Sequence, residues 1–277
     1  MDRPRDRRFR WWMPIVASFA VLAVITGVLV LLFATRDQAD PKPVSEALEE
    51  FAATSTSFVA GTVARRPPAG VYVLEGEGRE EISFPPTSQD DGATMPASVT
   101  HLADGCWSFK IDYNEAHWQD WSLCPSGDSL VETGGRTWQA WDFGASTVTN
   151  LSTFACDPPA LFVPGSTAAD RPTERSCTGT NEQVPGTTTS AGTVTSLGSE
   201  ALDIEGRTVA AIHVRFDNTL TGAQTGDERN DLWLRVDDWL PLRGEREVHI
   251  DSDSPVGTIT YTEQGSWQLT STDRAGP

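Results

Sequence analysis

The hydrophobic and polar positions of this chain form three successive patterns. The stretch from Trp11 to Thr35 carries no charged residue, and a helix of that length spans the roughly 30 Å apolar core of a bilayer. From Ser45, apolar residues recur at spacings of three and four, which predicts an amphipathic helix. From Gly70 onward, runs of Val, Ile, Thr and aromatic residues alternate with Gly, Pro, Asp and Asn, which is typical of antiparallel β-structure. The pattern therefore predicts a membrane helix followed by a mainly β domain.

The apolar segment has two interpretations, an uncleaved membrane anchor or a cleaved secretory signal. A signal peptide has an apolar region of about 7–15 residues that ends in a small-x-small site. This segment is longer, and Leu32 stands where cleavage after Ala34 would need a small residue. The arginines before it favour a cytoplasmic N-terminus; they are Arg3, Arg5, Arg7, Arg8 and Arg10. We predict a cytoplasmic tail at 1–10, a transmembrane helix at 11–35, a linker at 36–44 and an extracytoplasmic domain at 45–277, anchored in the plasma membrane.

The expected fold is α+β: the transmembrane helix and then a curved antiparallel sheet or half-barrel with one docking helix. That helix starts at the candidate N-cap Ser45 and presents an apolar stripe suited to a sheet. The stripe consists of Leu48, Phe51, Ala52, Ser55 and Phe58 or Val59. The predicted strands are Gly70–Gly76, Glu80–Phe84, Ala97–Leu102, Cys106–Tyr113, Trp118–Cys124, Ser129–Glu132, Thr137–Phe143, Thr193–Ile204, Arg207–Asp217, Asp231–Val236, Leu242–Ile250, Thr258–Glu263 and Trp267–Thr270. The Pro-, Gly- and Thr-rich stretch Asp157–Gly192 is predicted to be a long connection, which allows two β-rich halves at 45–156 and 190–277.

Charge narrows the classes of partner. Without its first 39 residues the chain has 238 residues, of which 15 are basic and 36 acidic, a net charge of −21. An acidic domain of this kind argues against nucleic acid and anionic membrane surfaces as partners, because both are negative. Lys42 and Lys110 are the only lysines while arginine is abundant. That bias is typical of a high-GC bacterium such as an actinobacterium.

The cysteines Cys106, Cys124, Cys156 and Cys177 all fall in the predicted extracytoplasmic domain. An even count outside the cytoplasm favours two disulfides, and pairing in sequence order is the preferred one of three connectivities. A zinc site is the alternative, but the close C-x-x-C pairs that it needs do not occur in this sequence.

No motif of the sequence identifies a reaction. The common hydrolase and nucleotide-binding signatures are missing, and the histidines His101, His117, His213 and His249 lack metal-ligand spacing. Each histidine is expected to lie in a strand or loop, with its hydrogen bonds made within the protein. The stretch Asp217–Asp231 and the pair Asp251 and Asp253 offer calcium-type ligands, but solvated hairpin turns are the favoured interpretation. We therefore assign no catalytic, cofactor or metal residue and expect a protein that is not an enzyme and needs no cofactor.

Tryptophan is concentrated in the predicted domain, which holds eight of the ten. These side chains either fill a core against a curved sheet or line a groove for an apolar or carbohydrate ligand. The candidates for a groove are the two pairs with i, i+3 spacing beside polar residues, Trp118 with Trp121 and Trp138 with Trp141.

The segment Asp231–Arg243, which reads DLWLRVDDWLPLR, resembles a strand-turn-strand of the LolA-like lipoprotein carriers and mycobacterial lipid-binding lipoproteins. The strand around Tyr261 and the helix from Ser45 extend the resemblance. It implies a half-barrel wrapped on helices that binds acyl chains in its hollow.

Three functions remain in consideration. The leading one is non-catalytic binding of a lipid or other apolar envelope molecule under the sheet. The alternative is an accessory subunit that docks on another envelope protein. A carbohydrate-active hydrolase is the third. A lipid binder needs an apolar cavity, an interaction module an exposed apolar patch, and a hydrolase a cleft with two carboxylates about 5–10 Å apart.

Overall fold

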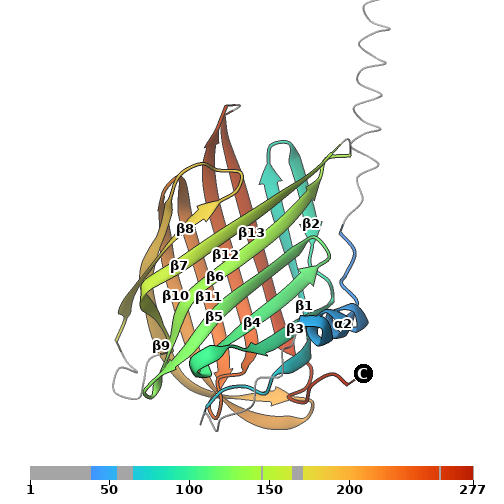
Figure 1. Cartoon of the computed structure of the whole chain (residues 1–277), viewed down its shortest axis with the longest axis vertical. Coiled ribbons are helices and arrows are strands. Elements are labelled where there is room, and N and C mark those ends of the chain that lie inside the picture. Colours follow the sequence, from blue (N-terminus) through green and yellow to red (C-terminus); the bar gives the residue numbers. More distant parts are fainter. Residues whose placement is uncertain (1–38, 55–64, 145, 164–170, 256, 277) are drawn as a thin grey trace, which may run out of the picture. The chain divides into compact units, whose positions relative to one another are not determined.

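The computed structural model describes residues 39–54, 65–144, 146–163, 171–255 and 257–276 (Figure 1). Its elements are α2 (Val44–Thr54), β1 (Gly70–Ser83), β2 (Pro86–Asp90), β3 (Thr94–His101), the short 3-10 helix η2 (Ala103–Gly105), β4 (Trp107–Asn114), β5 (His117–Ser126), β6 (Ser129–Asp142), β7 (Thr147–Val163), β8 (Thr173–Asn181), β9 (Thr188–Ile204), β10 (Arg207–Gly222), β11 (Gln224–Arg235), β12 (Pro241–Ser254) and β13 (Gly257–Leu269). The prediction of a mainly β domain with one docking helix is confirmed.

The sheet is closed, so the expected curved sheet or half-barrel was wrong. From β3 to β13 each strand pairs with the next, and β1 pairs with β3 on one side and β13 on the other. Closure comes from the β1–β13 ladder, which runs from Leu74 opposite Leu269 to Ile82 opposite Tyr261. β2 is an extra short strand that pairs with β1 at its distal end. The result is a barrel of twelve strands with β2 attached (Figure 1).

The registers arrange the inward-facing side chains in layers, because residues directly opposite one another share a face. We define four of them at successive positions along the strands. The apolar layer contains Gly76, Trp267, Gly244, Leu232 and Val214. The next contains Gly78, Gly265, Arg246, Asn230 and Phe216. The charged layer contains Glu80, Glu263, Val248, Glu228, Asn218, Gly192 and Arg175. The outer layer contains Ile82, Tyr261, Ile250, Gly226, Leu220 and Ser190.

The apolar end of the barrel, which holds the apolar layer and the core beyond it, is filled. Trp107, Trp239, Tyr72 and Phe109 are among its largest buried side chains, each at most 2% exposed. Gly244 shows how closely they pack, since a Cβ there would lie 2.5 Å from the indole ring of Trp267. A side chain without accessible area cannot line a space large enough for water. The apolar interior is therefore a packed core at these positions.

The helix α2 docks differently from the prediction. It starts at Val44, so Ser45 lies inside it and is not the N-cap. Ala47 is its buried residue, while Leu48 and Phe51 are half-buried. The Oε1 of Glu50 lies 2.6 Å from the Nζ of Lys42, and both residues reach β4: the Oε2 of Glu50 lies 3.8 Å from the Nζ of Lys110, and the Nζ of Lys42 lies 3.4 Å from the Oδ1 of Asp112. Ion pairs therefore do much of the docking that the apolar stripe was expected to do. The stripe's other predicted members, Ser55 and Phe58 or Val59, lie outside the described residues.

The stretch Asp157–Gly192 is not simply a long connection. β7 continues to Val163, β8 occupies Thr173–Asn181, and β9 begins at Thr188. The inward-facing residues of β8 are Arg175, Cys177 and Gly179, so the strand lacks the apolar alternation by which strands are recognised. The prediction failed because this part of the barrel interior is polar.

Both predicted disulfides are confirmed. Cys106 pairs with Cys124, and Cys156 pairs with Cys177. The second bond joins neighbouring strands, since the β7–β8 ladder pairs Ala155 with Thr178, the residues next to the two cysteines. Such bonds form in oxidising compartments.

The predicted tail at 1–10, the transmembrane helix at 11–35 and residues 36–38 of the predicted linker lie outside the described residues. Within the described ranges, none of the helices combines the length and apolar character needed to cross a bilayer. The boundaries proposed from the sequence, including the two halves, stay predictions.

Candidate functional site

The most unusual feature of the barrel is a charged network across its interior. Its members are Glu80, Glu263, Glu228, Asn218 and Arg175 of the charged layer, with Arg246 from the layer below and Glu132 from β6. Side chains of this kind are rarely buried unless they are paired. Glu80 is 0% exposed and Glu263 is 5% exposed. The pairing of each group therefore decides what the network can do.

Glu80 is the centre of one half of the network. Gln139 donates from Nε2 to its Oε2 at 2.6 Å, and Gln89 donates to its Oε1. The hydroxyl of Tyr261 lies 2.9 Å from Oε2 of Glu80 and 2.8 Å from Oε2 of Glu263. A phenol has one proton and can donate to only one of these carboxyl groups. The second contact therefore requires a proton on one of the two carboxyls.

The electrostatics assign that proton to Glu80. Burial, with a contribution from the nearby charge of Glu263, raises the pKa of Glu80 from 4.5 to about 8. Near neutral pH the protonated Glu80 donates to Tyr261, and Tyr261 donates to Glu263.

Asp91 is a second buried acid near Glu263. Burial and the charge of Glu263 raise the pKa of Asp91 to about 7. The carboxyl of Asp91 occupies the space that a side chain at Gly78 would need, since a Cβ there would lie 2.0 Å from its Oδ2.

Arg246 carries the positive charge at the centre of the network. Its Nε lies 3.0 Å from Oε2 of Glu263, and its Nη2 lies 3.4 Å from Oε1 of Glu228. Burial alone would raise the pKa of Glu228, but Arg246 and a hydrogen bond from Asn230 hold it below its ordinary value. Glu263 and Glu228 in turn keep the pKa of Arg246 above its ordinary value despite burial. This part of the network is a paired, ionised cluster.

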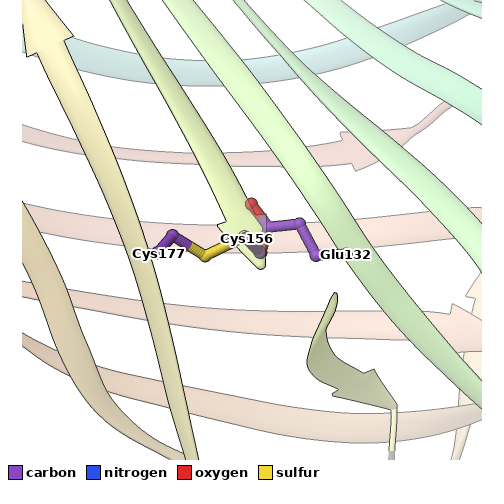
Figure 2. Close-up of side chains that lie close together, drawn as sticks. All are labelled: Glu132, Cys156 and Cys177. Carbon is purple, nitrogen blue, oxygen red and sulfur yellow. A yellow bond between two sulfur atoms is a disulfide. The ribbon is translucent and has the colours of Figure 1, made fainter. Parts of the chain in front are cut away.

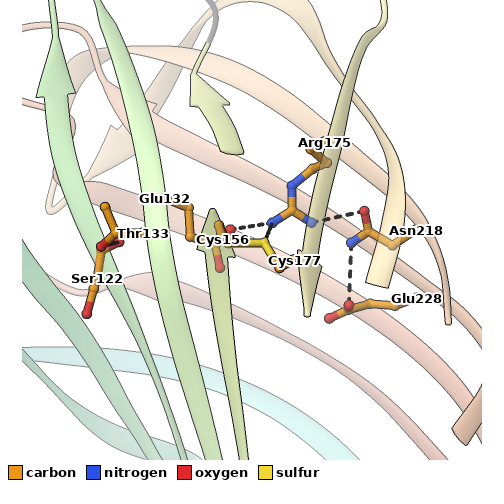
Figure 3. Close-up of a disulfide and its surroundings, with 8 residues drawn as sticks. All are labelled: Ser122, Glu132, Thr133, Cys156, Arg175, Cys177, Asn218 and Glu228. Carbon is orange, nitrogen blue, oxygen red and sulfur yellow. Dashed lines mark hydrogen bonds and ion pairs between the residues drawn. A yellow bond between two sulfur atoms is a disulfide. The ribbon is translucent and has the colours of Figure 1, made fainter. Parts of the chain in front are cut away.

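A second arginine extends the network to β6. Arg175 donates from Nη1 to Oδ1 of Asn218 at 3.0 Å and from Nη2 to Oε2 of Glu132 (Figure 3). Asn218 also donates to Glu228 at 3.4 Å, which connects the two halves. The network therefore runs from β6 through β8, β10, β11, β12 and β13 to β1.

Glu132, Cys156 and Cys177 lie close enough together for their ligand atoms to surround a metal ion (Figure 2). However, the two sulfur atoms are bonded to each other, and Glu132 pairs with Arg175. A disulfide sulfur is a poor metal ligand, since metal binding needs thiolates. We therefore assign no metal to this cluster.

Beyond the charged layer, the outer layer is more accessible. Ile82, Ile250 and Tyr261 face inward but are only half-buried. This is the end of the barrel at the top of Figure 1, where the β12–β13 turn lies. Trp141 of β6 packs its ring edge against Tyr261, with centroids 6.4 Å apart. The outer layer thus presents aliphatic and aromatic side chains above a polar floor.

The structure stacks two of the four candidate tryptophans on each other, and these two come from different predicted pairs. Trp118 and Trp138 lie opposite each other in the β5–β6 ladder, with stacked rings 6.4 Å apart. Lys110 and Arg136 lie within 5.4 Å of the Trp118 ring. Trp121 instead packs with Phe109 against the core. Residues i and i+3 of a strand point to opposite faces of the sheet. The two members of each predicted pair are therefore separated, and the four rings line no common groove.

The histidines are only partly as expected. His101 lies 2.9 Å from the carbonyl of Pro67, and His213 lies 3.0 and 2.7 Å from Glu200 and Asp231. His117 is the exception, because it is 0% exposed and neither ring nitrogen has a hydrogen bond among the described residues. Its Nδ1 lies 3.4 Å from Oε1 of Glu80. Burial lowers the pKa of His117 to about 4, so the ring is neutral.

Most residues of the charged network were missed by the sequence analysis. Asn218, Glu228 and Asn230 fall within Asp217–Asp231, which was interpreted as a solvated turn. That stretch is instead the ends of β10 and β11, joined at residue 223. The pattern that could have revealed the longer strand is the spacing of two between Phe216, Asn218 and Leu220, which places the three side chains on one face.

Glu80 and Glu263 are a close carboxyl pair, and such pairs occur in glycoside hydrolases. Both are buried, so this pair does not line a cleft that a substrate enters in the described conformation. The absence of catalysis stays a prediction.

The fold and the site define a class: a closed antiparallel β-barrel with one docked helix, two disulfides and a buried charged network. No known family model matches the chain, and no curated protein matches it. Among solved structures, the hypothetical lipoprotein YmcC from Escherichia coli K12 is similar at 10% identity and a TM-score of 0.31, over 82% of this chain and 97% of that chain. A likeness this weak carries no argument about fold or function. The resemblance to the LolA-like group stays a hypothesis.

Proposed function

We propose that the protein is a non-catalytic binding domain outside the cytoplasm that receives an amphipathic molecule at the end of the barrel lined by the outer layer. The observation that carries this proposal is the half-buried set Ile82, Ile250 and Tyr261 above a polar floor. Ligand sites are typically concave and apolar, with a few polar groups that fix the orientation of the ligand. The packed apolar end offers no comparable access.

Two further features support the location. The disulfides favour an oxidising compartment. The predicted helix at 11–35 would hold the barrel next to the membrane, where amphipathic molecules are concentrated.

The test uses the full chain in phosphatidylcholine nanodiscs and a monoacylglycerol that carries a photoreactive diazirine in its acyl chain. After irradiation, peptide mass spectrometry locates the adducts. We expect adducts at Ile82, Ile250 and Tyr261. The variant Ile250→Trp fills the outer layer and should lose them, whereas His249→Trp changes the outward-facing neighbour in the same strand and should keep them. Adducts spread over the outer wall of the barrel would refute the proposal.

A second candidate is the accessory subunit, which is favoured by a depression of about 740 Å³ on the outer wall. Its lining includes Glu77, Arg79, Arg229 and Glu247, and it suits a polar protein surface with alternating charges. Cross-linking in intact cells tests it, because the variant Arg229→Glu should abolish any partner contact made there.

A further inference from the structure

His117 is a polar residue of the barrel interior whose ring nitrogens have no hydrogen-bond partner among the described residues. Its imidazole is fully buried. A buried polar group without a partner costs free energy, because it loses its hydrogen bonds to water. Such a cost is tolerated where a further partner binds.

The position of His117 connects it to the outer layer. His117 lies opposite Gln139 in the β5–β6 ladder, so the two side chains share the inward face. Two residues further along β6, Trp141 faces the same way and contacts Tyr261. Glu80, His117, Gln139 and Tyr261 therefore form one polar cluster below the Trp141–Tyr261 contact, and we call it the floor cluster.

The floor cluster carries no net charge near neutral pH. Burial keeps Glu80 protonated, with its pKa at about 8, and keeps His117 neutral, with its pKa at about 4. The neighbouring ions are already paired, as Arg246 contacts both Glu263 and Glu228. A charged ligand group would therefore be buried without a counter-ion, which is strongly unfavourable.

We propose that the floor cluster binds the uncharged, hydroxyl-bearing head group of an amphipathic ligand, with His117 accepting or donating the hydrogen bond that it lacks among the described residues. This proposal rests on the proposed function and names the head group that the same site selects. A hydroxyl group both donates and accepts, and so suits a neutral imidazole in either tautomer. Glu80 and His117 are 0% exposed in the described structure, so the head group reaches them only when the ring contact of Trp141 with Tyr261 above them opens.

The experiment compares three photoreactive amphiphiles with the same acyl chain, a monoacylglycerol, a fatty acid and a lysophosphatidylcholine, on the full chain in nanodiscs at pH 7. We expect the monoacylglycerol to label the outer layer about tenfold more than the other two, which corresponds to about 1.4 kcal/mol. Equal labelling of the outer layer by all three would overturn the head-group proposal and leave the proposed function intact. No outer-layer labelling by any of them would overturn both.

Variants assign the preference to the floor cluster. His117→Phe keeps a ring of similar size but removes both nitrogens, and it should abolish the preference while acyl-chain labelling persists. Gln139→Leu should reduce it independently, which covers the case in which the first variant does not fold. Trp138→Phe is the matched control, because Trp138 is the outward-facing neighbour of Gln139. If the preference for the monoacylglycerol persists in both His117→Phe and Gln139→Leu, the floor cluster is not its cause.

Discussion

The apolar end and the charged layer occupy one barrel interior but are stabilised in different ways. At the apolar end, Phe109 is 2% exposed and contacts Trp121 and Trp267, each with ring centroids 6.1 Å away. In the charged layer, Glu263 is equally well buried but depends on Arg246 and Tyr261. Apolar packing loses energy in proportion to the volume removed. A buried ionic network instead depends on each partner, because a single loss leaves a charge unpaired.

The difference also separates stability from function. Among the described residues of the apolar end, Tyr72 is titratable, but burial raises its pKa to about 12, so it stays neutral near pH 7. This end fixes the barrel. The charged layer holds titratable groups next to the accessible outer layer, and it is the part that can respond to a ligand. Substitutions at the apolar end, in the charged layer and at α2 test this division.

Phe109→Ala tests the packed end. Removal of a fully buried aromatic side chain leaves a cavity, and we expect a loss of about 4 kcal/mol in the free energy of unfolding. Urea unfolding with the disulfides intact measures it. Ser108→Ala, at the outward-facing neighbouring position, should change the free energy by less than about 0.5 kcal/mol. A small effect of Phe109→Ala would mean that this end is loosely packed.

Arg246→Met tests the charged layer. It removes the cation between Glu263 and Glu228, and we expect a loss of about 3 kcal/mol. The loss should be partly recovered by adding Glu263→Gln and Glu228→Gln, which remove the unpaired charges. The outward-facing Arg243→Met is the control, because its partner Glu245 is solvent-exposed. If the triple variant is no more stable than the single one, unpaired charge is not the cause.

The pH dependence of stability sharpens the contrast. Between pH 4.5 and 8 the folded protein keeps the proton of Glu80 that the unfolded chain releases, so this group favours unfolding as pH rises. Asp91 acts in the same direction up to its pKa of about 7. His117 acts in the opposite direction between pH 4 and 6.5, where only the unfolded chain takes up its proton. Above pH 6.5 the unfolded chain no longer takes up this proton, so His117 no longer offsets the effect of Glu80 and Asp91 on the free energy of unfolding.

We therefore expect the free energy of unfolding to fall between pH 6.5 and 8, by about 1.4 kcal/mol per pH unit for each acid still protonated. Urea unfolding at half-unit pH steps measures the slope. Glu80→Gln should flatten it, while Glu81→Gln, which changes the exposed neighbour paired with Arg79, should not. An unchanged slope in Glu80→Gln would show that Glu80 is ionised in the folded protein.

The docking of α2 should show the smallest effect. Glu50 contacts Lys42 at 2.6 Å but is about half exposed, so Glu50→Gln should cost no more than about 1 kcal/mol and less at high salt. Unfolding in 50 and 500 mM salt, with the exposed Glu49→Gln as control, measures it. A loss that does not depend on salt would indicate packing by Leu48 and Phe51 instead.

How well each element was predicted depends on what faces inward. The strand from Arg207 was recognised because Val214 and Phe216 alternate with polar residues. The strand Thr173–Asn181 was missed because Arg175, Cys177 and Gly179 face inward, and none of them signals a buried face. Likewise, the polar ends of β10 and β11 were interpreted as a turn. The predictions failed where the charged layer replaced apolar side chains.

The sequence was enough to predict the class of secondary structure and the position of the docking helix, and to prefer the observed pairing of the cysteines among three possible ones. These depend on local periodicity, on turn residues and on the short separations of 18 and 21 residues between paired cysteines. The closure of the sheet and the charged network depend instead on contacts between distant parts of the chain. Glu80 and Tyr261 are 181 residues apart in the chain and meet because β1 pairs with β13. No local pattern encodes a contact of that separation, since it exists only when the first and last strands of the barrel come together.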